Sequence, residues 1–386
     1  MRIGFFTYLK PEYGGGVAKY FTEVASGLSK RYKDLDLTLI SFNEKTLRSI
    51  IFIYWIYFFG AQDKNLNNKE TKKDVLKKLG RAGYQEVGLR SLKKQLQGFD
   101  LIYTTNNLLE VILIKYLLGY KNLPPVIYGF HIPAVYPTTK SLQAKLHNMI
   151  YSSGLYLSAA LEAKRLHVLN SFDENWLGEK FPKGKVVKIY NPFDFDNFEA
   201  GAKRKTFRFN WNKKKFNILW VGRLTAQKGI DNLVEIIHTL NSSNYKDSIV
   251  WNITGEGELK ADILNLKKKW DNVNYFGYVA NSYLPSIYKN NDLFIATSSW
   301  ESFPYNLLEA QSFGLGVVAF DIAGVNEIID NNKNGYLVSD TRAFIRKVAY
   351  LSGSNKMEKE KIKAYIRNKF DQENIFKRLY SLFTEK

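Results

Sequence analysis

The positions of apolar residues predict that the chain opens with a strand, a loop and a helix. Residues 2–9 (RIGFFTYL) form a short apolar run that is typical of a buried strand. The glycine-rich stretch KPEYGGG follows and predicts a turn. Beyond it, apolar side chains recur at the three- and four-residue spacing of one helix face: Val17, Tyr20, Phe21, Val24 and Leu28.

The same order of elements returns near the middle of the chain. FNILWVG predicts a strand, RLTAQKG a loop, and IDNLVEIIHTL a helix with one apolar face, formed by Ile230, Leu233, Ile236, Ile237 and Leu240. Later strand-like runs (VWNIT, NVNYF, DLFIAT and GVVAF) alternate with helical segments. Strands that alternate with helices form parallel sheets covered on both faces, so two restarts of the pattern predict two doubly wound α/β domains.

A polar and basic stretch with little periodicity, residues 191–215, lies between the two patterns and predicts a linker. The length of 386 residues is also more than one ordinary core requires. The segment FDQENIFKRLYSLF predicts a final amphipathic helix, whose apolar side carries Ile375, Phe376, Leu379, Tyr380 and Phe383.

Composition narrows the chemistry. The absence of cysteine rules out disulfides, thiolate nucleophiles and cysteine-based metal sites, and fits a reducing compartment. The opening MRIGFFTYL lacks the features of a signal peptide, so the cytoplasm is the expected location. The 56 basic and 37 acidic residues give a net charge of +19, which favours an anionic partner: nucleic acid, a membrane surface or a phosphorylated ligand.

One apolar run stands beside a basic block. Ile50–Phe59 (IIFIYWIYFF) would reach roughly 15 Å as a helix, about half of a bilayer core, so it cannot span a membrane. The segment Lys64–Lys94 follows, with ten Lys or Arg against three acidic residues. Either the run is buried in the core, or it lies at a membrane interface with the basic block beside it.

Ligands of open parallel sheets bind at the carboxyl ends of the strands, so the loops that follow strands are the places to search. The glycines of GGG, including Gly15 and Gly16, could let backbone N–H groups approach an oxyanion, although a plain tight turn explains them equally well. In VGRLTAQKG, Arg223 and Lys228 together suit a diphosphate, while the alternative is two solvated basic side chains. His131 in YGFHIP follows an apolar strand, but a single histidine is commonly structural.

The stretch ESFPYNLLE carries two carboxylates eight positions apart. Pro304 suits the first turn of a helix, which places Glu301 on the loop at the end of a strand and Glu309 about one and a half turns into the helix. Both carboxylates could face one crevice and accept hydrogen bonds from sugar hydroxyls, while the N–H groups between them donate to phosphate. The alternative is two exposed carboxylates beside an amphipathic helix. No spacing indicates a metal site, and we interpret Asp194 and Asp196 as turn residues.

Taken in order, these motifs resemble the retaining GT-B glycosyltransferases of the large fourth sequence family, also called glycosyl transferases group 1. VGRLTAQKG looks like the family's Arg-x4-Lys donor-phosphate loop, and ITGEGEL is similar to its next strand-end glycine turn. NVNYFGYV looks like the base-binding segment, and ESFPYNLLEAQSFGLGVVAFDIAGVNEIIDNNKNGYLV resembles the E-x7-E block. The resemblance is strong from about 217 to 340 and loose before 190.

The resemblance implies two Rossmann-like domains that face each other across a cleft. An acceptor domain would span 1–195, with the helix at about 371–386 packing back on it, and a donor domain would span 196–370. Glu309 would bind the ribose hydroxyls, Glu301 the donor sugar, and Arg223 with Lys228 the diphosphate, without a metal ion or other cofactor. Catalytic roles would fall to Glu301, His131, Arg223 and Lys228. The donor-binding set would be Gly15, Gly16, Arg223, Lys228, Gly255, Tyr278, Val279, Glu301, Ser302, Phe303, Pro304 and Glu309.

By the same resemblance, a UDP- or GDP-linked sugar is the donor, and a lipid-linked saccharide or other glycan is the acceptor. The basic block beside an apolar run favours an anionic membrane surface over nucleic acid, so we expect a cytoplasmic, peripheral membrane protein. Two rival functions stay open: a nucleotide-sugar epimerase of the same architecture, and a glycosyltransferase that acts on nucleic acid. A third possible function is that of a sugar-binding protein without activity. The presence of all four charged residues disfavours it: Arg223, Lys228, Glu301 and Glu309.

Overall fold

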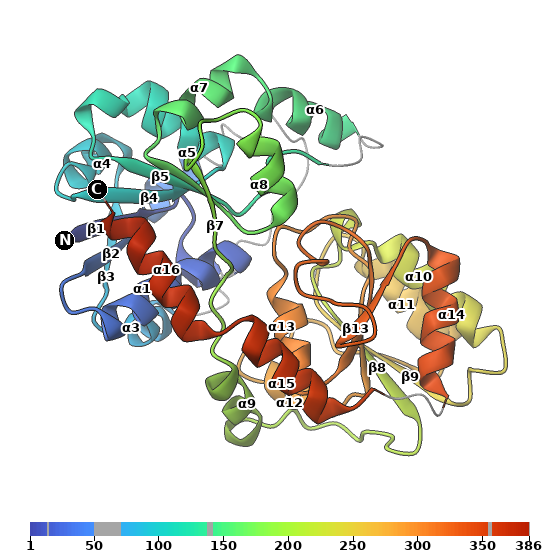
Figure 1. Cartoon of the computed structure of the whole chain (residues 1–386). Helices are drawn as coiled ribbons and strands as arrows, with labels where there is room; N and C mark the ends of the chain where they lie inside the picture. The colour runs from blue at the N-terminus through green and yellow to red at the C-terminus, as the bar shows by residue number, and fades with distance from the viewer. Residues whose placement is uncertain (14, 50–70, 137–141, 354–356, 386) are drawn as a thin grey trace. The chain divides into compact units, whose positions relative to one another are not determined.

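A computed structural model describes residues 1–13, 15–49, 71–136, 142–353 and 357–385. The chain divides into two compact units, traced in Figure 1. Unit 1 consists of Met1–Pro192 and Gln372–Lys386, and unit 2 of Phe193–Asp371. The run Ile50–Phe59, for which burial or membrane contact was expected, lies outside the described residues. No helix within the described ranges is long and apolar enough to cross a bilayer.

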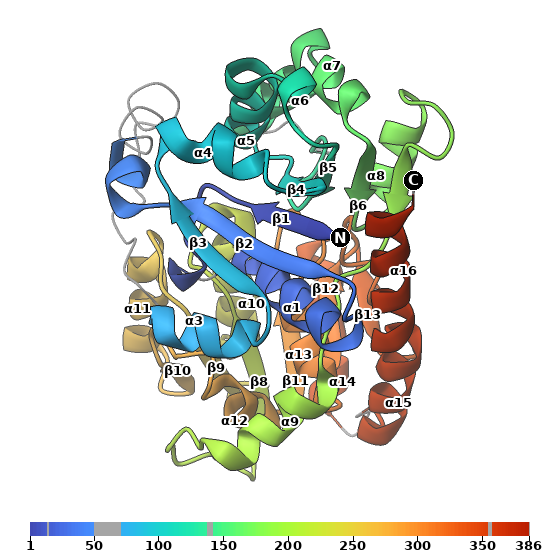
Figure 2. The ribbon, with the colours of Figure 1, turned by 90° about the vertical axis from the view of Figure 1, so that its left-hand side faces the viewer.

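In the described part of unit 1, seven parallel strands form one sheet in the order β3-β2-β1-β4-β5-β6-β7. The strands are β1 (Arg2–Phe6), β2 (Asp36–Phe42), β3 (Gly83–Val87), β4 (Leu101–Thr105), β5 (Val126–Phe130), β6 (Arg165–Val168) and β7 (Val186–Lys188). Along the chain, η1 (Pro11–Tyr13), α1 (Gly16–Arg31), α3 (Lys72–Leu79), α4 (Leu89–Leu96), α5 (Leu108–Ile112), η2 (Leu113–Leu118), η3 (Tyr120–Asn122), α6 (Leu142–Tyr151), α7 (Gly154–Glu162), α8 (Ser171–Gly178) and α16 (Gln372–Thr384) connect or cover them. Figure 2 shows α1 and α3 on one face of this sheet and α4, α5 and α7 on the other.

The final helix, α16, packs on α1. A Cβ atom on Gly27 would lie 2.1 Å from the ring of Phe376, so the glycine is what lets the two helices approach. Arg31 lies over the same ring, 4.2 Å from its centroid, and forms an ion pair with Glu373. Phe383 reaches the ring of Phe5 on β1, at a centroid distance of 5.5 Å. The residues that follow unit 2 in the sequence therefore complete the core of unit 1.

Unit 2 holds a second parallel sheet, which has six strands among the described residues, in the order β10-β9-β8-β11-β12-β13. The strands are β8 (Phe216–Val221), β9 (Ile249–Thr254), β10 (Val273–Tyr275), β11 (Leu293–Ala296), β12 (Gly316–Phe320) and β13 (Gly335–Val338). The helical segments are α9 (Phe195–Arg204), η4 (Ala226–Lys228), α10 (Ile230–Asn241), α11 (Lys260–Lys269), α12 (Leu284–Lys289), α13 (Tyr305–Ser312), α14 (Thr341–Ser352) and α15 (Lys359–Lys369). The predicted apolar face of residues 230–240 is buried along α10.

The predicted linker was wrong over part of its length, because residues 195–204 form helix α9. The side chain of Asp194 accepts a hydrogen bond from the Asn197 N–H at 3.0 Å and so caps the start of this helix. Asp196 forms an ion pair with Arg367 at 2.8 Å. Both carboxylates thus have structural partners within unit 2.

Candidate functional site

The loops that follow β8 and β9 lie against each other. Gly255 has φ of +146°, and a Cβ atom on it would lie 1.7 Å from the carbonyl oxygen of Gly222. The backbone of Leu224 accepts a hydrogen bond from Leu259 and donates one to Glu256, both at 3.0 Å. Only glycine fits at position 255. Because it has no side chain, the loop that carries Arg223 and Lys228 can lie close to the end of β9.

The far end of the same loop is fixed to the loop after β11. Gly229 has φ of +63°, and a Cβ atom there would lie 1.9 Å from the Thr297 carbonyl oxygen. The hydroxyl of Thr297 donates to the Lys228 carbonyl at 2.8 Å, and the Ser299 N–H donates to the Gln227 carbonyl at 2.9 Å. These bonds place Lys228 beside the segment that carries Glu301.

Lys228 and Glu301 form an ion pair, and their side chains are only 15% and 10% exposed. The hydroxyl of Ser298 donates a second hydrogen bond to the Glu301 carboxylate, at 2.7 Å. An ion pair this sheltered from water is screened less than a surface pair. The structure therefore brings together two of the predicted residues, one cation and one anion, from the ends of neighbouring strands β8 and β11.

Arg223 is exposed and has a different environment. Its guanidinium donates to the Gln227 side chain at 3.1 Å, and no carboxylate pairs with it among the described residues. Gln227 in turn lies near the Trp300 carbonyl, at 3.4 Å. The loop after β8 thus carries one cation that is paired with a carboxylate and one that is held only by a neutral amide.

Helix α13 begins close to the position predicted from Pro304, which is the residue that immediately precedes its first turn. Asn306 in that turn donates to the carbonyl of Val221 at 2.9 Å, which ties the start of the helix to the end of β8. On the same helix, the Glu309 carboxylate accepts a hydrogen bond from the Tyr288 hydroxyl at 2.9 Å. Burial, together with Glu309, raises the pKa of Tyr288 well above its ordinary value.

The alternative of two exposed carboxylates is wrong. Glu301 and Glu309 are each 9% exposed, and each accepts a hydrogen bond from a neighbouring hydroxyl. Gly324, with φ of +79°, lies against the backbone of this segment, because a Cβ atom on it would be 2.4 Å from the Ser302 carbonyl oxygen. Sequence reasoning missed the partners Ser298 and Tyr288, although Ser298 stands only three positions before Glu301.

The remaining donor-side residues of the prediction lie on adjacent parts of unit 2. The loop after β10 joins the loop after β9, because the Gly255 N–H donates to the Gly277 carbonyl at 2.8 Å. In that loop Tyr278 is 44% exposed, whereas Val279 is buried. Phe303 is buried and packs on Phe370, with ring centroids 5.4 Å apart.

Three predicted residues, Gly15, Gly16 and His131, belong to unit 1. Gly15 precedes the first turn of α1 with φ of +92°, and Cβ atoms on Gly15 and Gly16 would meet nothing within 4 Å. His131 follows β5, and its Nε2 lies 3.0 Å from the hydroxyl of Tyr103. Burial, together with the neighbouring His167, lowers the pKa of His131 well below its ordinary 6.5. The imidazole is therefore neutral near pH 7.

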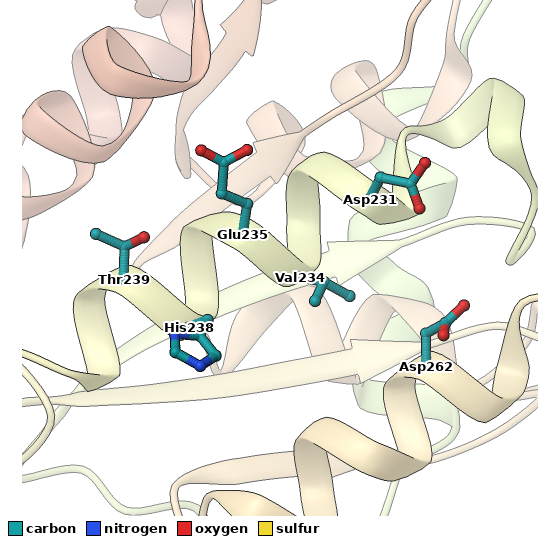
Figure 3. Close-up of a pocket in the computed structure, with 6 residues that line it drawn as sticks. All are labelled: Asp231, Val234, Glu235, His238, Thr239 and Asp262. Atoms are coloured by element: carbon teal, nitrogen blue, oxygen red, sulfur yellow. The ribbon is translucent and has the colours of Figure 1, made fainter.

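A surface hollow of about 410 Å³ lies elsewhere in unit 2, between α10 and α11 (Figure 3). Five of its lining residues come from α10 and one from α11: Asp231, Val234, Glu235, His238, Thr239 and Asp262. Its three carboxylates disfavour a phosphorylated ligand, and it is built on helices instead of strand ends. Among the described residues, no group of three or more His, Asp or Glu side chains could hold a metal ion.

Comparisons with known proteins bear on the family of unit 2 and on the fold. The profile of the family described as glycosyl transferases group 1 matches residues 202–369, which lie within unit 2. The solved sucrose-phosphate synthase from Thermosynechococcus elongatus has a similar fold, with a TM-score of 0.73 at 16% identity over 99% of this chain and 98% of that one. By this match, unit 2 contains a group 1 glycosyl transferase domain.

Two bacterial proteins illustrate what the whole chain is similar to. An uncharacterized 41.2 kDa protein in the cps region of Klebsiella pneumoniae is 32% identical over 52% of this chain and 56% of that protein. The chain thus spans about half the length of this relative. The UDP-Gal:alpha-D-GlcNAc-diphosphoundecaprenol alpha-1,3-galactosyltransferase of Escherichia coli is 27% identical over 67% of each chain. The predicted fold class, two Rossmann-like units of the GT-B type, is confirmed.

Proposed function

We propose that this protein is a group 1 glycosyl transferase, which moves a sugar from a nucleoside-diphosphate donor to a hydroxyl acceptor with retention of anomeric configuration. The observation that carries the proposal is the arrangement of Arg223, Lys228 and Glu301 at the carboxyl ends of β8 and β11. Cations at a strand end suit a diphosphate, and a sheltered carboxylate beside them suits sugar hydroxyls.

In the proposed reaction, the bond between the anomeric carbon and the donor diphosphate breaks as the acceptor oxygen bonds to the same face of that carbon. The departing phosphate oxygen takes the proton of the acceptor hydroxyl. Arg223 and Lys228 stabilise the negative charge that develops on the diphosphate. A diphosphate at this loop competes with Glu301 for the Lys228 ammonium, so that donor binding frees Glu301 to accept hydrogen bonds from the sugar. This exchange needs no metal ion.

The donor we propose carries UDP or GDP, and UDP is the first choice because the Escherichia coli relative is named for UDP-Gal. The Glu309 carboxylate on α13 would accept hydrogen bonds from the ribose hydroxyls, as the motif resemblance implies. Tyr278 is exposed enough to stack on a base, with Val279 beneath it.

For the acceptor we propose a lipid-linked saccharide at an anionic membrane face, in keeping with the diphosphoundecaprenol named for the same relative. The described part of the basic block offers some support. Lys73 and Lys77 on α3 are exposed, and Lys72 on the same helix forms an ion pair with Glu86 at 2.6 Å. Reversing Lys73 and Lys77 to glutamate should therefore weaken sedimentation with anionic liposomes and leave the melting temperature unchanged.

The function is tested by incubating the purified chain with a panel of UDP- and GDP-sugars and a panel of diphosphoprenol-linked acceptors. We expect one donor class to raise the melting temperature, since a ligand at 100 times its dissociation constant adds about 2.7 kcal/mol. Transfer is then followed by mass spectrometry, and the anomeric configuration of the product by proton NMR. An inverted product would contradict retention. Turnover of the nucleotide sugar to an epimer without acceptor would favour the epimerase.

A further inference from the structure

A chain of hydrogen bonds crosses three neighbouring strands of unit 1. Tyr103 lies on β4, Gly129 on β5 and His167 on β6, and these strands are adjacent in the sheet. In the strand register Gly129 stands directly beside His167, and Ile127, two residues earlier, stands beside Tyr103. Because side chains on one face of a sheet repeat every second residue, Tyr103 and His167 share a face with position 129.

Gly129 makes the crossing possible. A Cβ atom at this position would lie 1.9 Å from the Tyr103 hydroxyl oxygen and 2.8 Å from Nε2 of His131. The glycine therefore leaves the space through which the tyrosine of β4 reaches His167 on β6. The hydroxyl oxygen of Tyr103 lies 2.8 Å from Nδ1 of His167 and 3.0 Å from Nε2 of His131.

The position of each proton in this series of hydrogen bonds can be assigned from one end, where His167 meets a backbone carbonyl. Nε2 of His167 lies 2.8 Å from the backbone carbonyl oxygen of Ile189, which can only accept, so this nitrogen carries the proton. Burial lowers the pKa of His167 to about 4, and the ring is neutral near pH 7. Nδ1 of His167 is therefore an acceptor.

The next proton is settled by distance. Two hydroxyls are near Nδ1 of His167: that of Tyr103 at 2.8 Å and that of Tyr20 at 3.5 Å. The shorter contact is within the range of a good hydrogen bond and the longer one is not, so Tyr103 donates its single proton to His167. The Tyr20 hydroxyl also hydrogen-bonds the Tyr103 hydroxyl, whose oxygen has a second lone pair to accept it. The Tyr103 oxygen is then an acceptor toward His131, and Nε2 of His131 must be the donor.

His131 is thereby left with its proton on Nε2 and a lone pair on Nδ1. The ring packs against Tyr20, with centroids 4.3 Å apart, and against Phe21, with centroids 6.0 Å apart. His131 as a whole residue is partly exposed, and among the described residues its side-chain hydrogen bond, to Tyr103, is on Nε2 and not on Nδ1. A neutral nitrogen acceptor with partial exposure suits the hydroxyl of a ligand.

We propose that Tyr103 and His167 are positioning residues, which hold His131 in the neutral Nε2–H tautomer so that Nδ1 accepts a hydrogen bond from a hydroxyl of the sugar substrate. The ligand half of this statement rests on the proposed function, whereas the tautomer half does not. Gly129 belongs to the same device, because any side chain there would separate Tyr103 from both histidines.

The tautomer is measured directly by long-range proton–nitrogen NMR on a chain labelled with nitrogen-15 histidine. The chain has four histidines, so single His→Gln variants assign the signals. We expect His131 and His167 both in the Nε2–H form at pH 7.5. A wild-type His131 in the Nδ1–H form, or as the cation, would overturn the proposal whether or not the chain transfers sugar.

The variant Tyr103→Phe removes only the central hydroxyl. It should weaken the preference of His131 for the Nε2–H tautomer and lower kcat/KM for sugar transfer about tenfold or more. Tyr128→Phe is the matched control, because it also removes a buried hydroxyl of the same sheet, one that bonds Tyr120 and not a histidine. Equal losses of kcat/KM in the two variants, at equal melting temperatures, would contradict a positioning role.

A double-mutant cycle separates positioning from packing. Glutamine at 131 has no tautomers, so in the His131→Gln background Tyr103→Phe should change kcat/KM less than about twofold. An undiminished tenfold loss in that background would show that Tyr103 acts without His131. If no nucleotide sugar is turned over by the wild type, the proposed function fails, while the NMR measurement still decides the tautomer.

Discussion

The two units differ in the charge state of the ionisable groups at their candidate sites. At the strand ends of unit 2, charge is kept: Lys228 and Glu301 are paired and sheltered, and Arg223 is exposed. Behind the strand ends of unit 1, charge is removed: His131 and His167 are held neutral by burial and joined through Tyr103. Under the proposed function, the charged groups of unit 2 would stabilise the diphosphate, and the neutral groups of unit 1 would form hydrogen bonds with hydroxyls.

The largest expected effect comes from crowding the loop that presents the charges. Gly255→Ala places a Cβ atom against the Gly222 carbonyl at a backbone φ of +146°, and should lower the free energy of unfolding by about 3 kcal/mol. Gly154→Ala is the control, because nothing lies within 4 Å of its Cβ position at the start of α7. Denaturant titration compares them, and equal stabilities of the two variants would refute the requirement for glycine at position 255.

Next in size is the loss of the sheltered cation. Lys228→Ala should raise the activation free energy of transfer by about 1.5–3 kcal/mol, because a charge-assisted contact to the diphosphate is lost. Lys246→Ala removes a lysine of another ion pair, with Asp271 at 3.3 Å, at the opposite end of the same sheet before β9. Steady-state kinetics should separate the two variants, and similar kcat/KM values would remove Lys228 from the site.

Acid should weaken unit 1. Burial lowers the pKa of His147 and of His167 to about 4, from 6.5. The unfolded chain then takes up protons at a higher pH than the folded one, so the stability is full above pH 6.5 and falls as the pH drops toward 4. Each histidine should cost about 2 kcal/mol between pH 7 and pH 5, which hydrogen exchange of unit 1 peptides can measure.

One carboxyl group in unit 1, that of Asp173, increases the free energy of unfolding as the pH falls. Burial raises the pKa of Asp173 to about 6, from 3.8, so its contribution falls as the pH rises through that interval. The two histidines outweigh it, and these three groups together should cost unit 1 about 2 kcal/mol between pH 7 and pH 5. His131, whose pKa is also lowered, adds to this loss. Protection factors of unit 1 peptides, corrected for the slower intrinsic exchange at lower pH, that are equal at both values would show that the histidines are not neutral in the fold.

The smallest expected effect is that of removing metal ions. With Arg223 and Lys228 opposite the diphosphate, transfer should continue at an unchanged rate in EDTA, as measured by release of the nucleoside diphosphate. Activity that EDTA abolishes and Mg²⁺ or Mn²⁺ restores would place part of the diphosphate charge on a cation instead of on unit 2.

Sequence patterns predicted the sheets because buried parallel strands and amphipathic helices leave strong periodic signals, as in β8 and α10. They missed α9, since FDNFEAGAKR has few apolar residues and its cap at Asp194 looks like any turn. They also could not tell whether Glu301 was buried, because burial depends on Ser298 and Lys228 arriving from different loops. The link from Tyr103 to His167 was invisible for the same reason: it exists only once the order of the strands is known.

The packing of α16 on α1 sets an order for biosynthesis. Residues Gln372–Lys386 belong to unit 1, but a ribosome makes them only after all of Phe193–Asp371. At 5–20 residues per second, the first part of unit 1 waits on the order of ten to forty seconds for the helix that covers Phe5 and fills the notch at Gly27. During that interval the nascent protein presents an open apolar surface, so its first half should depend on chaperones more than its second.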